Sequence, residues 1–422
     1  MKQIFTKFFF FIFLFVLALS ADAQWTALDY HNPQRGSLYI TKHGTILSMG
    51  MMRGVDVGVN CGESWISPSE VQDVEYSSAI EVGDALMMGG DYAKFARSYD
   101  DGARWDVIDY SHILTDPKEL QAAVYALCYY KDRLFMGRYG TGVYYSDDLG
   151  STWTATDRVS LQLPGNQGGG EFVFHLMEFK GRLYNIGSSG IWRLNEDSLD
   201  LTWECVFRPQ DMQGIDGRFP WLYTAVEVDG MMMIVNGDQF SKTILKTYDG
   251  ENYEKLEYGG DLTTANIRGL YYDGQYIYAA TSYDDAGTTK GVFVSDDAGT
   301  TWTRVSEGLT NATYMKFDVW EGNIYTCGFE DGKIYWMPLL NHTSVDNHDA
   351  EGYVDIIVMG SSFRVVSEIQ GIEVVVYDLM GRVVYRNTDN VLHDLSGLNA
   401  GLYVAAVVEG GIIKAKEKIM VR

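Results

Sequence analysis

One short pattern recurs along the chain and constrains its fold more than any other feature. The spacing Ser-x-Asp-x-Gly-x-x-Trp begins at Ser98, Ser146 and Ser295, and a degenerate copy ends at Trp65. In such a turn the Ser and Asp side chains can hydrogen-bond local backbone groups, the Gly accepts an open backbone conformation, and the Trp covers the sheet behind it. Because the turn returns at a roughly constant spacing, the sequence predicts a repeat architecture.

A second pattern marks the same repeats independently. A Gly or Asp turn is followed each time by a short apolar strand, and successive turns are separated by 39, 49, 49, 49, 44 and 48 residues. This spacing is typical of four-stranded propeller blades. The turn positions are Gly44, Gly83, Asp132, Gly181, Gly230, Gly274 and Gly322. They predict seven blades, and six or eight remain open.

The aromatic residues that begin the last strand of each repeat also number seven. Trp25 precedes the first Gly turn, whereas the last repeat ends near Trp336 with no such strand after it. We therefore expect the N-terminal strand at 25–30 to complete the last blade and close the ring, which protects exposed sheet edges. The predicted fold class is all-β, a seven-bladed propeller over residues 24–340 followed by a small β-sandwich.

The remaining segments differ from the repeats in composition. Residues 1–23 have the charged, apolar and small-residue regions of a secretory signal peptide. Residues 341–352 are polar without periodicity and are predicted to be a linker. Residues 353–422 contain short strands and Gly turns that predict a separate small sandwich. No later segment is long and apolar enough to predict a membrane span.

Charge and cysteine spacing exclude several functions. The formal net charge of -24 disfavours binding to nucleic acid or to an anionic membrane surface. The four cysteines lie far apart, each in a different repeat, without metal-ligand spacing. We expect buried free thiols, no metal site and no cofactor. Isolated histidines such as His112 and His175 are interpreted as structural.

The recurring turn resembles the Asp-box, or BNR, repeats of sialidases, xyloglucan-type glycoside hydrolases, sortilin-like receptors and photosystem assembly factors. The resemblance covers residues 24–340 and implies a propeller. In the enzymes of this group the Asp-box lies on the face away from the active site. The resemblance therefore implies a structural role, and no catalysis, for Asp100, Asp148 and Asp297.

The C-terminal segment is similar to the sorting domain of proteins exported by type IX secretion in certain Gram-negative bacteria. The similarity rests on residues 376–384, 393–404 and 418–422. The Pro-Asn-Pro segment that usually opens this domain is missing near residues 341–355. The resemblance implies that residues 353–422 engage the type IX secretion machinery and are removed, and that the protein is secreted or attached to the cell surface.

Function is expected on the face that carries the longer loops, since long loops on a rigid scaffold commonly form binding sites. In each blade the connections before the first strand and after the second strand share this face. Aromatic and polar side chains there could hold a glycan or a protein ligand. The candidates are Arg53, Tyr92, Arg138, Tyr139, Asp216, Trp221, Asp238, Arg268 and Tyr283, with Phe219 and Phe240 as further aromatic residues.

The alternative function is glycoside hydrolysis. A sialidase would need three arginines around a substrate carboxylate and a Tyr–Glu pair. Arg53, Arg138 and Arg268 lie near predicted strand ends and Arg35 lies upstream, but the sequence places no complete set. A xyloglucanase would need two loop aspartates, for which Asp91, Asp216 and Asp238 are available, but those enzymes pair two propellers. No catalytic residue is assigned.

Overall fold

The computed structural model describes most of residues 24–421. Contacts divide the chain into two compact units, the first ending at Asn341 and the second beginning at His342. The predicted signal peptide at 1–23 and the predicted linker at 341–352 lie outside the described residues. Within the described part, no helix is long and apolar enough to cross a membrane. Also outside the description are residues 34, 51–52, 115–116, 163–170, 189, 213–220, 238–241, 265, 283–290, 311, 353, 360–361, 368–371, 379–381, 389–391, 396, 400, 410–411 and 422.

The described strands of the first unit form seven sheets, in each of which consecutive strands pair antiparallel. The first three sheets contain β2 (Ser37–Ile40), β3 (Ile46–Met49), β4 (Asp56–Val59) and β5 (Ser64–Ile66); β6 (Tyr76–Val82), β7 (Ala85–Gly90), β8 (Lys94–Ser98) and β9 (Asp106–Asp109); and β10 (Val124–Tyr130), β11 (Arg133–Arg138), β12 (Gly142–Ser146) and β13 (Thr154–Ala155). The next two contain β14 (Val173–Phe179), β15 (Arg182–Gly187), β16 (Gly190–Asn195) and β17 (Thr202–Phe207); and β18 (Leu222–Val228), β19 (Met231–Asn236), β20 (Thr243–Thr247) and β21 (Glu254–Leu256).

The last two sheets each gain a strand from elsewhere in the chain. One contains β23 (Ile267–Tyr272), β24 (Ile277–Thr281), β25 (Gly291–Ser295) and β26 (Thr301–Arg304), and the short β22 (Gly259–Gly260) pairs parallel with β26. The other contains β27 (Tyr314–Trp320), β28 (Asn323–Gly328) and β29 (Ile334–Pro338), and β1 (Thr26–Ala27) pairs antiparallel with β29. Short 3-10 turns lie at Ser69–Val71, Ser111–Ile113, Pro117–Gln121, Val159–Leu161 and Pro209–Asp211.

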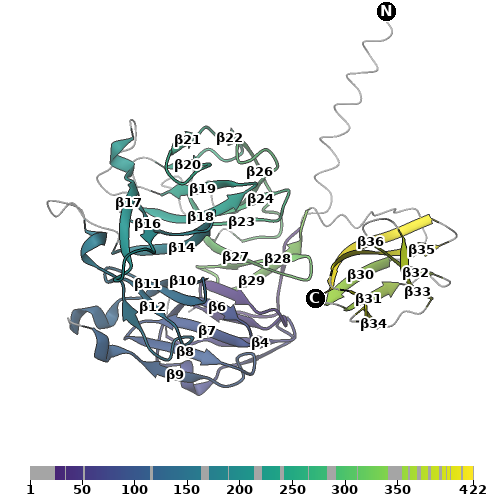
Figure 1. Cartoon of the computed structure of the whole chain (residues 1–422), viewed down its shortest axis with the longest axis horizontal. Coiled ribbons are helices and arrows are strands. Elements are labelled where there is room, and N and C mark those ends of the chain that lie inside the picture. The colour runs from purple at the N-terminus through teal and green to yellow at the C-terminus, as the bar shows by residue number, and fades with distance from the viewer. Residues whose placement is uncertain are drawn as a thin grey trace, which may run out of the picture. The chain divides into compact units, whose positions relative to one another are not determined.

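Leaving aside β1 and β22, the strand of each sheet that comes earliest in the chain is here called its first strand. The first strands lie near the centre of this unit (Figure 1). Neighbouring first strands contact one another in the order β2, β6, β10, β14, β18, β23 and β27, and β27 in turn contacts β2. Apolar side chains from adjacent sheets share cores. For example, Phe135 and Trp192, from consecutive sheets, belong to one buried cluster. Packing of sheet faces against each other removes this apolar surface from water and holds the sheets in place.

The recurring turns have the hydrogen bonds that their sequence predicts. In the turn at 146–153, the Ser146 hydroxyl donates to Asp148 (2.8 Å) and accepts from the Gly150 N–H (2.7 Å), while the Asp148 carboxylate accepts from the Thr152 N–H (2.8 Å). A shorter version at 247–253 was missed in the sequence, because Thr247 replaces Ser and one residue is deleted before the aromatic. There the Gly250 N–H donates to the Thr247 hydroxyl (2.9 Å).

The second unit contains two sheets that share one core. One sheet has the order β30–β31–β34 and the other β33–β32–β35–β36. Ile356 and Phe363 of the first sheet are buried together with Val376, Ala405 and Ile419 of the second. The strands are β30 (Val354–Met359), β31 (Ser362–Ser367), β32 (Glu373–Asp378), β33 (Val383–Asn387), β34 (Leu392–Asp394), β35 (Gly401–Glu409) and β36 (Ile412–Val421).

Candidate functional site

A β-bulge interrupts the start of six of the seven first strands. In β6, β10, β14, β18 and β23 the pairing with the next strand skips the second residue, and in β27 it skips the second and third. A bulge re-aims a side chain that regular pleating would direct into the sheet packing. The skipped residues are Ser77, Tyr125, Phe174, Tyr223, Arg268, Met315 and Lys316.

All of these skipped residues line one cavity of about 600 Å³, here called the axial cavity. Its wall is completed by Ser37 at the start of β2 and by residues of the loops that meet the same strand ends, including Glu75, Tyr139, Trp221 and Phe329. The volume lies within the range of small-ligand sites, about 300–1,000 Å³. Every first strand therefore contributes a side chain to a single site.

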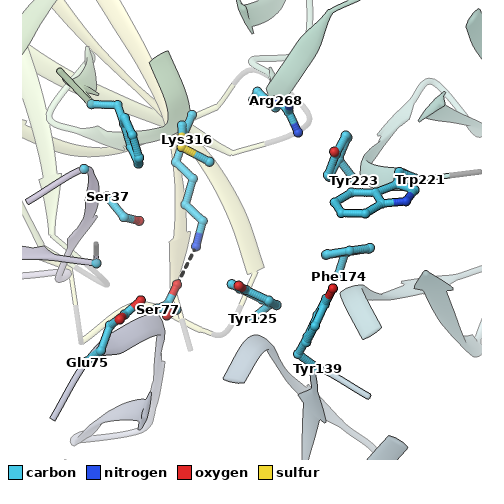
Figure 2. A pocket seen from close by; sticks show the side chains of 14 residues that line it. Ser37, Glu75, Ser77, Tyr125, Tyr139, Phe174, Trp221, Tyr223, Arg268 and Lys316 are labelled. Atoms are coloured by element: carbon cyan, nitrogen blue, oxygen red, sulfur yellow. Dashed lines mark hydrogen bonds between the residues drawn. The ribbon is translucent and has the colours of Figure 1, made fainter. Parts of the chain in front are cut away.

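Four aromatic rings form a continuous wall on one side of the axial cavity (Figure 2). Phe174 stacks with Trp221 at a centroid distance of 5.6 Å and an interplanar angle of 29°. The ring centroid of Tyr139 lies 6.0 Å from that of Phe174, and the ring centroid of Tyr125 lies 5.8 Å from that of Tyr139. Tyr125, Tyr139 and Trp221 remain more than one third exposed. Accessible rings held by their neighbours in this way can stack on a ligand without reorganising.

Lys316 lies on the opposite, polar side of the axial cavity. Its Nζ donates a hydrogen bond to the Ser77 backbone oxygen at 3.0 Å, so that the side chain crosses from β27 to β6 (Figure 2). Burial lowers the pKa of Lys316, and the neighbouring Asp318 partly offsets this effect. Burial and the charge of Lys316 also lower the pKa of His175, to about 4, so this imidazole is neutral at physiological pH.

Arg268 supplies a second cation to the axial cavity. Its Nε donates to the Ser282 hydroxyl at 3.0 Å, and its guanidinium lies 4.0 Å from the centroid of the Tyr223 ring. These two contacts orient the guanidinium but leave part of its hydrogen-bonding capacity unused.

Glu75 is the carboxylate of the axial cavity. Burial and the neighbouring Asp91 raise its pKa, and the Glu75 N–H donates to the Asp91 carboxylate at 3.1 Å. Burial also raises the pKa of Tyr125, with smaller contributions from Glu75 and Tyr139. A Tyr with a raised pKa is poorly suited to act as a nucleophile, whereas a Glu with a raised pKa can hold a proton.

Apart from Arg138, the predicted candidates separate into three groups. Tyr139, Trp221 and Arg268 line the axial cavity together. Arg53 and Tyr92 form a separate pair, with the guanidinium 5.1 Å from the ring centroid, and neither lines the cavity. Asp216, Asp238 and Tyr283, together with Phe219 and Phe240, lie outside the described residues.

Arg138 stands apart because it is fully buried. Its Nη2 donates to the backbone oxygens of Glu119 (2.7 Å) and Ala122 (3.3 Å), and its guanidinium packs over Tyr110. It therefore joins the end of β11 to the segment before β10. Arg35, the fourth arginine considered, forms an ion pair with Asp56 at 3.4 Å. Among the described arginines, Arg53, Arg138 and Arg268 each have different partners and only Arg268 lines the cavity.

Sequence reasoning missed Ser37, Ser77, Tyr125, Phe174, Tyr223 and Lys316, because it looked for function in the loops and not in the first strands. It also missed Glu75, which lies in the loop directly before β6. The sequence does contain a signal for the first-strand residues of the cavity. The first-strand residues that face the cavity lie six or seven positions before the Gly or Asp turn of their own repeat. Aligning the repeats on that turn would have placed these residues in one column.

A smaller hollow of about 380 Å³ adjoins Tyr139 and is lined by Glu119, Thr141 and Arg158, among others. Arg158 is already neutralised there by ion pairs with Glu119 and with Glu171 (2.6 Å). Among the described residues, no group of three or more His, Cys, Asp or Glu is placed to hold a metal ion. The four cysteines are free, and Cys327 is buried.

Comparison with solved structures identifies the fold. YCF48 from Cyanidioschyzon merolae superposes with a TM-score of 0.53 at 17% identity, over 75% of this chain and 98% of that one. Virginiamycin B lyase from Staphylococcus aureus gives a TM-score of 0.55 at 11% identity, over 75% and 99%. Both are β-propellers. The first unit has a β-propeller fold.

A third similar structure is the extracellular domain of the putative one component system BT4673 from B. thetaiotaomicron, with a TM-score of 0.53 at 13% identity. The match covers 95% of this chain and 59% of that one. No protein-family model and no curated protein matches the sequence. Identities this low define the fold of the propeller, and its activity has to be argued from the axial cavity itself.

Proposed function

We propose that this protein is a secreted or cell-surface β-propeller that binds an extracellular ligand in the axial cavity. The carrying observation is that bulges at the starts of six first strands direct side chains into one aromatic-lined cavity. Bulges disrupt pairing and are common next to functional sites. Fully buried rings would stabilise the fold more than accessible rings do. The exposure of the rings in the axial cavity therefore favours a binding role.

The same proposal includes the finer architecture. The seven sheets are seven blades, and β1 acts as the outer strand of the blade that contains β27, β28 and β29. The pairing of Thr26 with Trp336 and the contact between β2 and β27 support this arrangement. The hydrogen-bonded turns, with their Ser-x-Asp spacing, support assignment to the Asp-box class.

The cellular location in this proposal rests on the two ends of the chain. Residues 1–23 direct export across the inner membrane, residues 341–352 form the linker, and residues 353–422 act as the type IX sorting domain. The two-sheet core of the second unit is compatible with such a domain. Secretion with cleavage near residue 341 in a type IX host would support this assignment, and retention in the periplasm would contradict it.

Binding can be tested on the protein that begins at residue 24, with a glycan array and a peptide array. We expect a discrete set of ligands whose affinity falls at least tenfold in Trp221→Ala, because the variant removes an exposed ring from the wall. The matched control is Tyr248→Ala. Tyr248 is 55% exposed but follows β20, at the opposite end of the strands. Equal loss in both variants, or no ligand in either array, would contradict a site in the axial cavity.

Two ligand classes are tested by these arrays. One similar structure is described as YCF48 bound to D1 peptide, with a TM-score of 0.51 at 17% identity, which makes a peptide a reasonable ligand to include. Glycans are the other class, because aromatic walls commonly stack on sugar rings.

Glycoside hydrolysis is the second candidate function, and Glu75 is the observation that favours it. Its raised pKa and its position in the cavity suit a general acid. A panel of fluorogenic glycosides and sialosides tests this function. Turnover that disappears in Glu75→Gln while binding is retained would establish an enzyme, and absence of turnover with a bound ligand would leave binding as the function.

A further inference from the structure

Neither cation of the axial cavity forms an ion pair with a carboxylate among the described residues, although the buried Asp318 lies near enough to Lys316 to partly offset the lowering of its pKa. Lys316 makes one hydrogen bond, to a backbone oxygen, and Arg268 contacts a hydroxyl and an aromatic ring. No ion pair joins either residue to another described residue. The chain as a whole carries a formal charge of -24, so carboxylates are abundant elsewhere. The lack of a direct ion pair at these two residues is therefore a specific feature of the cavity.

A cation that lacks a direct ion pair in a partly enclosed site lowers stability, because the site replaces water poorly around the charge. The lowered pKa of Lys316 reflects this cost. Glu75, the carboxylate that lines the cavity, is influenced by Asp91 and forms no ion pair with Lys316. A bound anion would compensate Lys316 and Arg268, since charge-assisted hydrogen bonds to a carboxylate are stronger than those between neutral groups.

The rest of the cavity indicates what carries the anion. Trp221, Phe174 and Tyr139 offer ring faces on one side, and the polar residues Ser37 and Ser77 line the other side with Lys316 (Figure 2). Flat apolar faces opposite hydroxyl groups fit a sugar ring, which has C–H faces and hydroxyl edges. A peptide that binds by strand addition would require backbone partners along a regular strand edge, and the bulges disrupt those edges.

We propose that the axial cavity binds a saccharide that carries a carboxylate, with the sugar ring against the Trp221–Phe174–Tyr139 wall and the carboxylate beside Lys316 and Arg268. This inference rests on the proposed binding function and specifies its ligand.

The test uses matched pairs of ligands that differ in the carboxylate, measured by calorimetry on the protein that begins at residue 24. The pairs are methyl β-glucuronide with methyl β-glucoside, sialyllactose with lactose, and galacturonan oligomers with galactan oligomers. At least one acidic member should bind tenfold or more tightly than its neutral counterpart. Because salt only partly screens charges in a partly enclosed site, the ratio should shrink modestly as NaCl is raised.

Variants then assign the preference to the two cations. Lys316→Met and Arg268→Gln should each reduce the acidic-to-neutral ratio severalfold, and the two single variants protect the test against a folding defect in one of them. Trp221→Ala should weaken both members of a pair and leave their ratio unchanged. Lys180→Met, which removes an exposed lysine at the other end of β14, is the matched control and should alter neither.

The outcomes separate this inference from the function on which it rests. Equal binding of acidic and neutral saccharides, with loss in Trp221→Ala, would overturn the carboxylate and retain the binding site. Binding of a hexapeptide with a free C-terminus, and of no saccharide, would overturn the saccharide. Absence of any ligand that depends on Trp221 would overturn both.

Discussion

Asp318 offers a direct test of the contact between the first and last sheets of the propeller. This residue of β27 accepts hydrogen bonds from the Ile40 N–H of β2 (2.6 Å) and from the Val319 N–H (2.8 Å). Burial nevertheless raises its pKa from 3.8 to about 6, against the opposing effects of these hydrogen bonds and of Lys316, while Glu81 adds to the rise. Keeping the Asp318 carboxylate ionised in the folded protein at neutral pH therefore costs free energy.

The direction of the pH effect follows from proton binding. Because the folded pKa exceeds the unfolded one, the folded protein binds more protons at this site between about pH 4 and pH 6. Asp318 then contributes most favourably below pH 4, and this contribution is lost as the pH rises through 6. At about 1.4 kcal/mol per pKa unit, the whole shift is worth about 3 kcal/mol, of which about 2 kcal/mol should appear between pH 7 and pH 4.

The assay compares the free energy of unfolding of the wild type and of Asp318→Asn in urea at both pH values. All ten tryptophans lie between residues 25 and 336, so their fluorescence reports the propeller alone. The variant also loses stability because its hydrogen bonds to the backbone are altered. This loss is the same at both pH values, so it cancels when the two are compared. Relative to the variant, the wild type should gain about 2 kcal/mol on acidification. Asp197→Asn, at an exposed position, controls for removing one carboxylate.

A stability difference between wild type and Asp318→Asn that stays constant from pH 7 to pH 4 would refute the reasoning. A difference that changes in the opposite direction would show that the hydrogen bonds from Ile40 and Val319 outweigh burial.

Three further predictions concern stability and reactivity. Asp297→Ala removes the acceptor of the Thr301 N–H and hydroxyl hydrogen bonds, so urea unfolding should show a loss of about 1–2 kcal/mol with ligand affinity unchanged; weakened binding would instead connect this turn to the site. Gly137→Ala should cost about 1–3 kcal/mol, because its added methyl group would overlap Val173 of the neighbouring sheet; an unchanged urea midpoint would contradict that packing. Burial raises the pKa of Cys327 to about 12, so iodoacetamide at pH 7.5 should label it only after unfolding, as mass spectrometry can show; rapid labelling of the folded protein would contradict its burial.

Much of the fold could be predicted because its signals are local. The short apolar strands expected after the turns at Gly181 and Gly230 are present as β15 and β19. The turn around Asp148 has its predicted hydrogen bonds because donors and acceptors lie within a few residues of one another. The turn at Thr247 escaped because a one-residue deletion changed the spacing while preserving the hydrogen bonds.

The sequence by itself determined the repeats, the order of the strands and the acidic character of the chain, since each depends on residues near one another or on composition. The tertiary structure alone decided which side chains share the axial cavity. Tyr125, Phe174 and Lys316 come from strands far apart in the sequence, and their direction depends on bulges that interrupt regular alternation. Arg138 shows the reverse case, because the packing around its strand end buries a side chain whose position suggested a binding role. A loop-length argument finds the correct end of the strands, but only the meeting of those strand ends brings the aromatic wall together with Lys316 and Arg268.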